Sequence, residues 1–145
     1  ALFALSFGAN AAVLKNKQNI DPASNELQVT KVVYDFAKDG GAVAAYEVAE
    51  ATGDIVIESI AVDGITALDS TGDAITVDLG VTASTTAFLS ASAQSNFEAG
   101  DMTAPAETFV PMKVAKGSKI LMEFKVAAAT AGKFVIAIIS RKFGQ

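Results

Sequence analysis

Few residues of this chain could carry out chemistry. The 145-residue sequence contains no histidine and no cysteine. This excludes disulfides, Cys or His metal sites, Cys nucleophiles and every catalytic triad built on histidine. No Ser-x-x-Lys sequence occurs, which removes the usual serine–lysine nucleophile pattern. Around Gly132-Lys133, positions 127 and 134 hold Ala and Phe where a Walker phosphate loop needs Gly and Ser or Thr, so we interpret this stretch as a β-turn opening a strand.

Carboxylates are the remaining candidates. Asp63, Asp69, Asp73 and Asp78 could offer oxygen ligands to Ca²⁺, but their spacing matches no EF-hand loop and they alternate with turn residues. A glycosidase needs a carboxylate pair, usually beside aromatic platforms, and only 8% of the residues are aromatic, with no Trp among them. We therefore predict that the chain is not an enzyme and takes no cofactor, metal or small-molecule substrate. A carbohydrate- or calcium-binding module remains an alternative.

The charge is acidic and unevenly distributed. The net charge of −5 argues against nucleic-acid and anionic-membrane partners, which attract Lys and Arg. Residues 39–107 hold twelve carboxylates and no Lys or Arg, whereas residues 113–145 hold seven cations and a single carboxylate, Glu123. Two interpretations follow. Acidic strands could pair with basic strands inside one sheet, or acidic and basic faces of neighbouring subunits could meet and set the register of an assembly.

The elements that position these residues begin with a predicted N-terminal arm, residues 1–28. Its first half is apolar but is not preceded by the basic residues of a secretory signal and is too short to span a membrane. Because an apolar terminus left in water would promote aggregation, we expect the arm to dock on its own domain or on a partner. The candidate adhesive residues are Leu2, Phe3, Leu5, Phe7, Val13 and Leu14.

Residues 29–145 are predicted to form one β-rich domain. Hydrophobic residues make up 51% of the chain, enough to form a core. Residues 29–36 alternate with a period of two, and Asp39-Gly40-Gly41 is typical of a hairpin turn that leads into a strand at 42–48. Residues 55–62, extended through 65–68, are apolar on both faces, as in a central strand.

The second half of this domain continues the pattern. Residues 74–79 alternate, with Asp78 predicted to face outward. Residues 80–108 are predicted to be a long insertion, either holding a short helix near 86–97 or forming a loop. Strands follow at 109–114, at 119–126 with Val126 on the inner face, and at 133–139, which is apolar on both sides. Seven or eight strands predict an all-β fold, a jelly-roll-like β-sandwich.

Four segments form a recognisable set of strand and turn motifs: residues 34–42 (YDFAKDGGA), 62–68 (VDGITAL), 72–80 (GDAITVDLG) and 130–134 (TAGKF). Together they resemble a family of small capsid decoration, or cement, proteins of tailed bacteriophages. The resemblance covers residues 31–140. The chain departs from the family pattern at Asp63-Gly64 and in the long apolar arm, which leaves the role of the arm open.

The resemblance implies a structural virion protein. It would form a homotrimer on the outer surface of the capsid, at local three-fold positions, and bind the major capsid protein after assembly in the bacterial host cytoplasm. There it would tie adjacent capsomers together against the pressure of the packaged DNA. The alternative is another multimeric virion or surface protein, such as a head fibre, a tail component or a pilus-like subunit.

Overall fold

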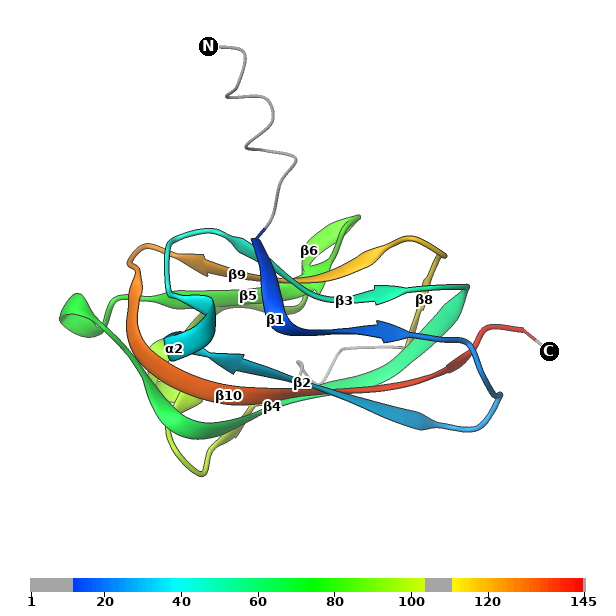
Figure 1. The fold of residues 1–145 in the computed structure, drawn as a ribbon, viewed down its shortest axis with the longest axis horizontal. Helices are drawn as coiled ribbons and strands as arrows, with labels where there is room; N and C mark the ends of the chain where they lie inside the picture. The colour runs from blue at the N-terminus through cyan, green and yellow to red at the C-terminus, as the bar shows by residue number, and fades with distance from the viewer. Residues whose placement is uncertain (1–11, 104–110, 145) are drawn as a thin grey trace, which may run out of the picture.

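The computed structural model describes residues 12–103 and 111–144, which form two β-sheets packed face to face (Figure 1). Sheet A has the strand order β1 (Ala12–Ile20), β3 (Ala45–Ala51), β9 (Lys119–Lys125), β5 (Thr76–Val81) and β6 (Ser84–Ala93). Sheet B has the order β2 (Gln28–Asp35), β10 (Ala129–Lys142), β4 (Ile55–Ser70) and β7 (Met102–Thr103), and β8 (Met112–Val114) also pairs with β4. The all-β, two-sheet prediction is confirmed.

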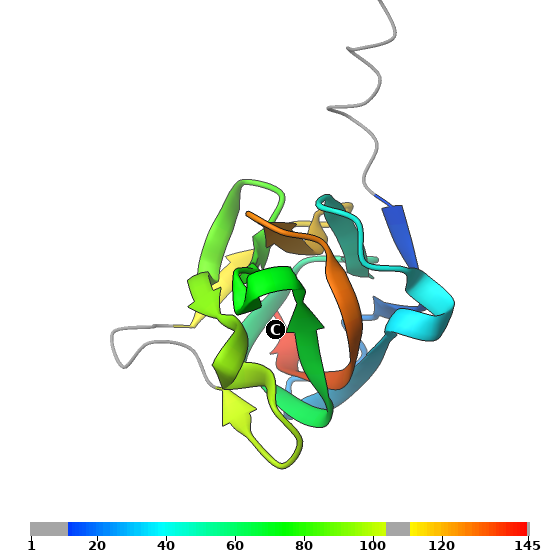
Figure 2. The same cartoon turned by 90° about the vertical axis from the view of Figure 1, so that its left-hand side faces the viewer.

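Nine of these strands, β2 to β10, pair as one nested hairpin. β2 pairs with β10, β3 with β9, β4 with β7 and β8, and β5 with β6, all antiparallel. The β5–β6 turn closes the hairpin, β7 and β8 both lie in sheet B, and every other connection from β2 to β10 leads from one sheet to the other. Seen end-on (Figure 2), the sheets curl around a common core.

An aromatic cluster fills this core. Tyr34 packs against Phe124 and Phe134 with ring centroids 5.2 and 4.9 Å away, Tyr46 packs on Phe124 at 5.4 Å, and Phe97 stacks on Phe134 at 5.4 Å. The phenol of Tyr34 donates a 2.6 Å hydrogen bond to the Gly40 carbonyl, which satisfies its polar end inside the core. The cluster joins β2 and β10 of sheet B to β3 and β9 of sheet A.

The predicted hairpin after residue 36 is wrong, because β2 and β3 belong to different sheets. The Asp35 carboxylate accepts a 3.0 Å hydrogen bond from the Ala37 amide and caps a single helical turn, α2 (Phe36–Asp39). Gly40 ends this turn at φ 75°, and Gly41 passes so close to Ala129 that a Cβ would overlap its backbone. The glycine pair therefore serves a crossover, and not a two-strand turn.

The helix predicted near residues 86–97 is also wrong. Residues of this stretch form β6, and only the short 3₁₀ turn η2 (Gln94–Phe97) is helical. β6 approaches β5 closely at Gly80, where a Cβ would overlap the backbone of Ser84 and Thr85. Phe97, with 1% exposure, inserts into the core from η2. Whether residues 80–108 are an insertion relative to other proteins stays a prediction, and residues 104–110 lie outside the described part.

For two side chains the structure reverses the predicted burial. Ile75, Val77 and Leu79 are buried as predicted, but Asp78, predicted to face outward, is only 2% exposed because β6 and Lys125 cover it. Val126, predicted on the inner face of its strand, is 74% exposed, because β9 ends at Lys125 and Val126 turns the chain at φ 75°.

Candidate interaction surfaces

The predicted arm contains a strand of the sandwich. β1 pairs in parallel with β3 at the edge of sheet A, and its register shifts between Val13 and Gln18. Leu14 points into the core at 2% exposure, whereas Val13 is 51% exposed. The other candidate residues of the arm, Leu2, Phe3, Leu5 and Phe7, lie outside the described residues. Leu14 is therefore committed to its own domain, and Val13 is the first candidate on the surface.

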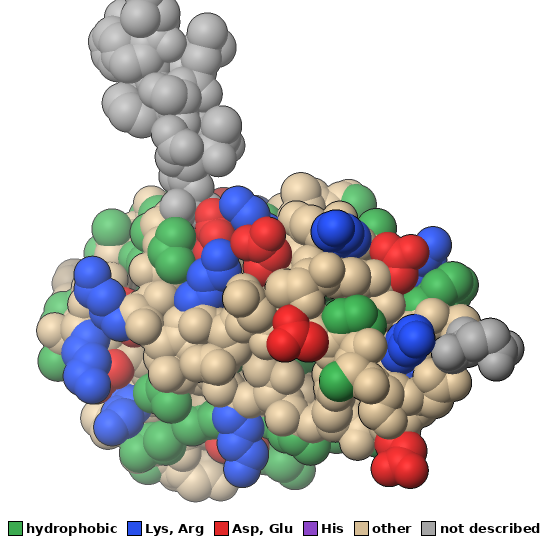
Figure 3. All heavy atoms as spheres, turned by 45° about the vertical axis from the view of Figure 1, so that its right-hand side comes forward, with side chains coloured by type: hydrophobic (Ala, Val, Ile, Leu, Met, Phe, Trp, Pro, Cys, Tyr) green, Lys and Arg blue, Asp and Glu red, His purple; other side chains and the backbone are tan. Residues whose placement is uncertain are grey.

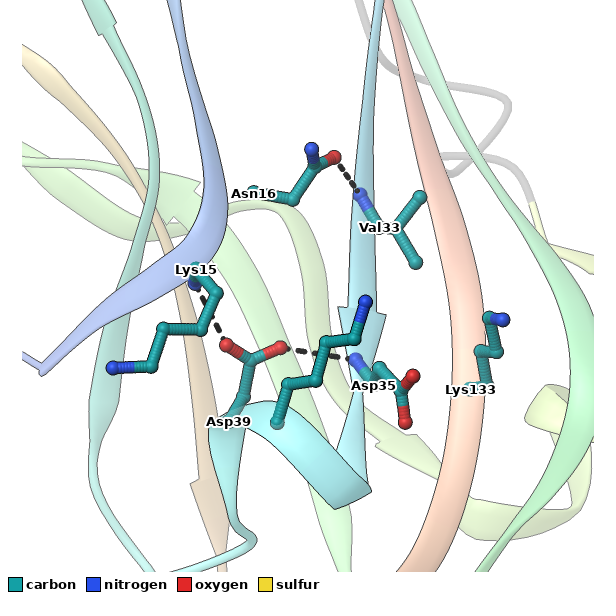
Figure 4. A pocket seen from close by; sticks show the side chains of 7 residues that line it. Lys15, Asn16, Val33, Asp35, Asp39 and Lys133 are labelled. Atoms are coloured by element: carbon teal, nitrogen blue, oxygen red, sulfur yellow. Dashed lines mark hydrogen bonds between the residues drawn. The ribbon is translucent and has the colours of Figure 1, made fainter.

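A cleft of about 220 Å³ lies where the edge strands β1 and β2 meet (Figure 4). Its lining residues are Lys15, Asn16, Val33, Asp35, Lys38, Asp39 and Lys133. The Asp39 carboxylate accepts hydrogen bonds from the amides of Lys15 (2.7 Å) and Asp35 (3.0 Å). The Asn16 side-chain oxygen accepts one from the Val33 amide at 2.8 Å.

These bonds give the cleft a structural role. The register shift in β1 turns its backbone away from β3, so that Lys15 and Asn16 reach α2 and β2. Asp39 uses both oxygens to satisfy backbone donors that the irregular edge would otherwise leave open. The cleft thus fastens β1 across the edge of the sandwich.

A second set of charges lies on the outer side of sheet A. Glu47 of β3 lies between Lys17 of β1 and Lys119 of β9, at 3.3 and 3.1 Å, and Lys17 also contacts Glu50 at 3.1 Å. The hydrogen bond that the Lys17 ammonium donates to Glu50 raises the pKa of Lys17, with a further contribution from Glu47 and against the effect of desolvation. An acidic strand is here held between two basic ones.

Other ion pairs also join a carboxylate from the middle of the sequence to a cation from its C-terminal part. Lys125 of β9 contacts the buried Asp78 carboxylate of β5 at 2.8 Å, and its hydrogen bond to Asp78 raises the pKa of Lys125. Arg141 of β10 pairs with Glu58 of β4, and Lys113 lies 3.7 Å from Asp54. Cations from the two ends of the sequence thus neutralise carboxylates from the middle within each sheet, as the first of the two charge interpretations predicts.

The outer side of sheet B, which we call the B face, is mostly apolar. Along β10, Phe134, Ile136 and Ile138 are buried while the alternate residues point outward and are partly exposed. The strand registers place outward residues of β2 and β4 beside them. The apolar side chains of the B face are Val29, Val33, Ala61, Ile65, Met102, Val135, Ala137 and Ile139.

Hydrophobic side chains accordingly gather along the lower side of the molecule in Figure 3, where sheet B lies in Figure 1. Val29 is 58% exposed, Ile65 48% and Met102 73%. Residues 55–62 and 133–139 are apolar on both faces, and this pattern predicts a central strand for residues 55–62. That same pattern was the signal for this surface, which sequence reasoning missed.

The four aspartates considered for calcium do not form a site. Asp78 is buried against Lys125, whereas Asp63, Asp69 and Asp73 are exposed along β4 and η1 (Thr71–Asp73). In the described part of the chain, no three acidic side chains converge as a metal site requires. Within residues 12–103 and 111–144, no helix has the length and apolar character needed to cross a membrane.

Comparison with known proteins finds no matching family model and no matching curated protein. The fold, in contrast, is similar to chains in three phage capsid structures. A chain in the capsid of Ralstonia phage GP4 matches with a TM-score of 0.60 at 14% identity, over 97% of this chain and 96% of that one. A chain in the cyanophage Pam1 capsid asymmetric unit matches with a TM-score of 0.58 at 22% identity, over 81% and 86%.

A chain in the acid-stable capsid structure of Helicobacter pylori bacteriophage KHP30 matches with a TM-score of 0.56 at 14% identity, over 81% and 89%. At these identities the likeness is one of fold. The two-sheet β fold of this chain is one that occurs in phage capsids.

Proposed function

We propose that this chain is a structural protein of a tailed-phage virion that decorates the outside of the capsid and ties neighbouring capsomers together. The observation that carries the proposal is the fold likeness to a chain of the Ralstonia phage GP4 capsid, which spans nearly the whole length of both chains. The sequence resemblance to decoration proteins over residues 31–140 supports the same role. The protein would assemble in the host cytoplasm, with the major capsid protein as its partner.

The physical design of the domain suits this role. A cement protein needs a rigid body, contacts with its own copies and an adhesive element, but no catalytic group. The rigid body is supplied by β4 and β10, of 16 and 14 residues, which pair along most of their lengths across sheet B. We also infer that the sandwich is a jelly roll, because strands that pair as one nested hairpin across two sheets are the arrangement that this fold has.

The adhesive element is the segment that precedes β1. Leu2, Phe3, Leu5 and Phe7 carry no charge and could bury apolar surface against the shell. At about 25 cal/mol per Å², four such side chains contribute several kcal/mol before the entropy of ordering is subtracted. A homotrimer at a local three-fold position would present three arms at once and gain further through avidity.

A binding assay with capsids that lack this protein tests the proposal. The full chain should cosediment with the capsids in a saturable manner. A chain lacking residues 1–11 should keep its circular dichroism and melting temperature, because the deletion stops before β1 at Ala12, but should bind at least tenfold more weakly. A variant with Leu2, Phe3, Leu5 and Phe7 changed to serine controls for the length of the chain.

Two results would count against the proposal. If the full chain does not bind capsids, the decoration role is wrong, and open-ended polymers in its place would favour a pilus-like or fibre subunit. If the truncated chain binds undiminished, the domain itself makes the contact and the role assigned to the arm is wrong.

A further inference from the structure

We propose that the B face is the surface by which copies of this chain contact one another, with the β2 side of one copy against the β4 side of the next. The inference deepens the proposed function by naming the surface that forms the homotrimer, but it does not need the capsid, because the contact would hold whether or not the assembly sits on one. It starts from a mismatch: the B face is apolar and open to solvent, and an apolar patch rimmed by charges is typical of a protein–protein contact.

Charge complementarity identifies a second copy as the occupant. Lys31 stands on the β2 side of the B face and Asp63 on the β4 side, with the outward residues of β10 between them. Both are exposed, and within the described residues neither side chain makes an ion pair, unlike most carboxylates of the middle strands. The other charged residues of the face have partners close by, since Asp35 lies opposite Lys133 in the β2–β10 register and Arg141 pairs with Glu58. Lys31 on one side and Asp63 on the other can therefore match each other between two copies.

The dimensions of the face fit a closed ring of three. Four strands spaced about 4.8 Å apart make the B face about 14 Å wide between its outer strands. Packed sheets lie about 10 Å apart, which puts each sheet about 5 Å from the middle of the contact. Three sheets around one axis at that distance form a triangular prism with sides of about 17 Å, close to the width of the face.

In such a prism each B face looks toward the axis. Ala137 of β10 would lie near the centre, where small and medium side chains from three copies can meet. At each corner the β2 side of one copy meets the β4 side of the next, where Asp63 lies one strand inside β7. Lys31 extends to this Asp63 in a head-to-tail contact that closes after three steps. The pairing also favours head-to-tail contacts, because a head-to-head contact would bring Lys31 of one copy next to Lys31 of another.

Charge exchange tests the pairing. Native mass is measured by sedimentation equilibrium over a range of concentrations for the unchanged chain and for K31E, D63K and the double variant K31E/D63K. Each single change should weaken association at least tenfold, and the double change should restore it, since the pair is then reversed but intact. K116E, in the exposed turn before β9, alters the net charge as K31E does and should leave association unchanged.

The apolar centre needs its own variant. Ala137→Lys places a charge in the middle of the B face without touching the core, and should leave a folded monomer by circular dichroism. If K31E and Ala137→Lys both associate like the unchanged chain, or if the unchanged chain is monomeric at all concentrations, the inference is overturned. Failure of the capsid-binding assay alone would overturn the proposed function and leave this contact standing.

Discussion

Substitution of Leu14 tests whether β1 is part of the folded domain and contributes to its stability. Leu14 is 2% exposed and packs in the core beneath the edge of sheet A. Leu14→Ala removes three carbon groups, about 2.4 kcal/mol of transfer free energy at about 0.8 kcal/mol each. The cavity left behind adds to this, but an edge strand can relax into part of it. We expect the free energy of unfolding to fall by about 3 kcal/mol.

Urea denaturation followed by circular dichroism measures this change. With a slope of about 2 kcal/mol per molar urea, the midpoint should fall by about 1.5 M. Val13→Ala is the matched control, because Val13 is the neighbouring residue of the same strand but is half exposed, and its effect should stay within about 0.5 kcal/mol. Equal and small effects of the two substitutions would refute the placement of β1 in the sandwich.

Three further predictions concern charge, backbone and pH. Asp78→Asn should lower the free energy of unfolding by about 2 kcal/mol in urea denaturation. Lys125→Met should lower it more, because that change leaves the buried Asp78 carboxylate without its cation. A larger loss for Asp78→Asn than for Lys125→Met would contradict the ion pair. Val126→Gly should raise the melting temperature, with a gain of about 1 kcal/mol, because Val126 holds a left-handed backbone at φ 75° in an exposed turn; a loss of stability would contradict this. Burial raises the pKa of Tyr34 and of Tyr46, so the stability that the two neutral phenols contribute is complete below the ordinary tyrosine pKa of about 10 and is lost as pH rises above it. Ultraviolet absorbance should show tyrosinate appearing together with unfolding. Ionisation of both phenols near pH 10 in the folded chain would contradict their burial.

Local patterns in the sequence predicted the strands well. The alternation of apolar and polar residues located β2, β5 and β9, and runs that are apolar on both sides located β4 and the central half of β10. These features depend on which face of a strand meets the core, and that information is present in adjacent residues. The excess of carboxylates in the middle of the chain likewise anticipated ion pairs such as Lys17–Glu47 between neighbouring strands.

The connections could not be read in this way. A glycine pair after residue 39 fits a hairpin and a crossover equally well, and only the pairing of β2 with β10, about 100 residues away in sequence, decides between them. Leu14 looked like the end of an adhesive arm because its burial depends on β1 lying beside β3. The B face could not be predicted for a similar reason, since the residue type alone does not tell whether an apolar side chain faces the core or the solvent.

We propose that this chain decorates a capsid as a closed multimer. A cryo-electron microscopy reconstruction of the phage particle that carries the chain would locate it. We expect density for the two-sheet domain on the outer surface at local three-fold positions, with three copies whose B faces look toward a common axis. Density for the chain in the tail, inside the shell or within the continuous capsid layer would overturn the decoration role.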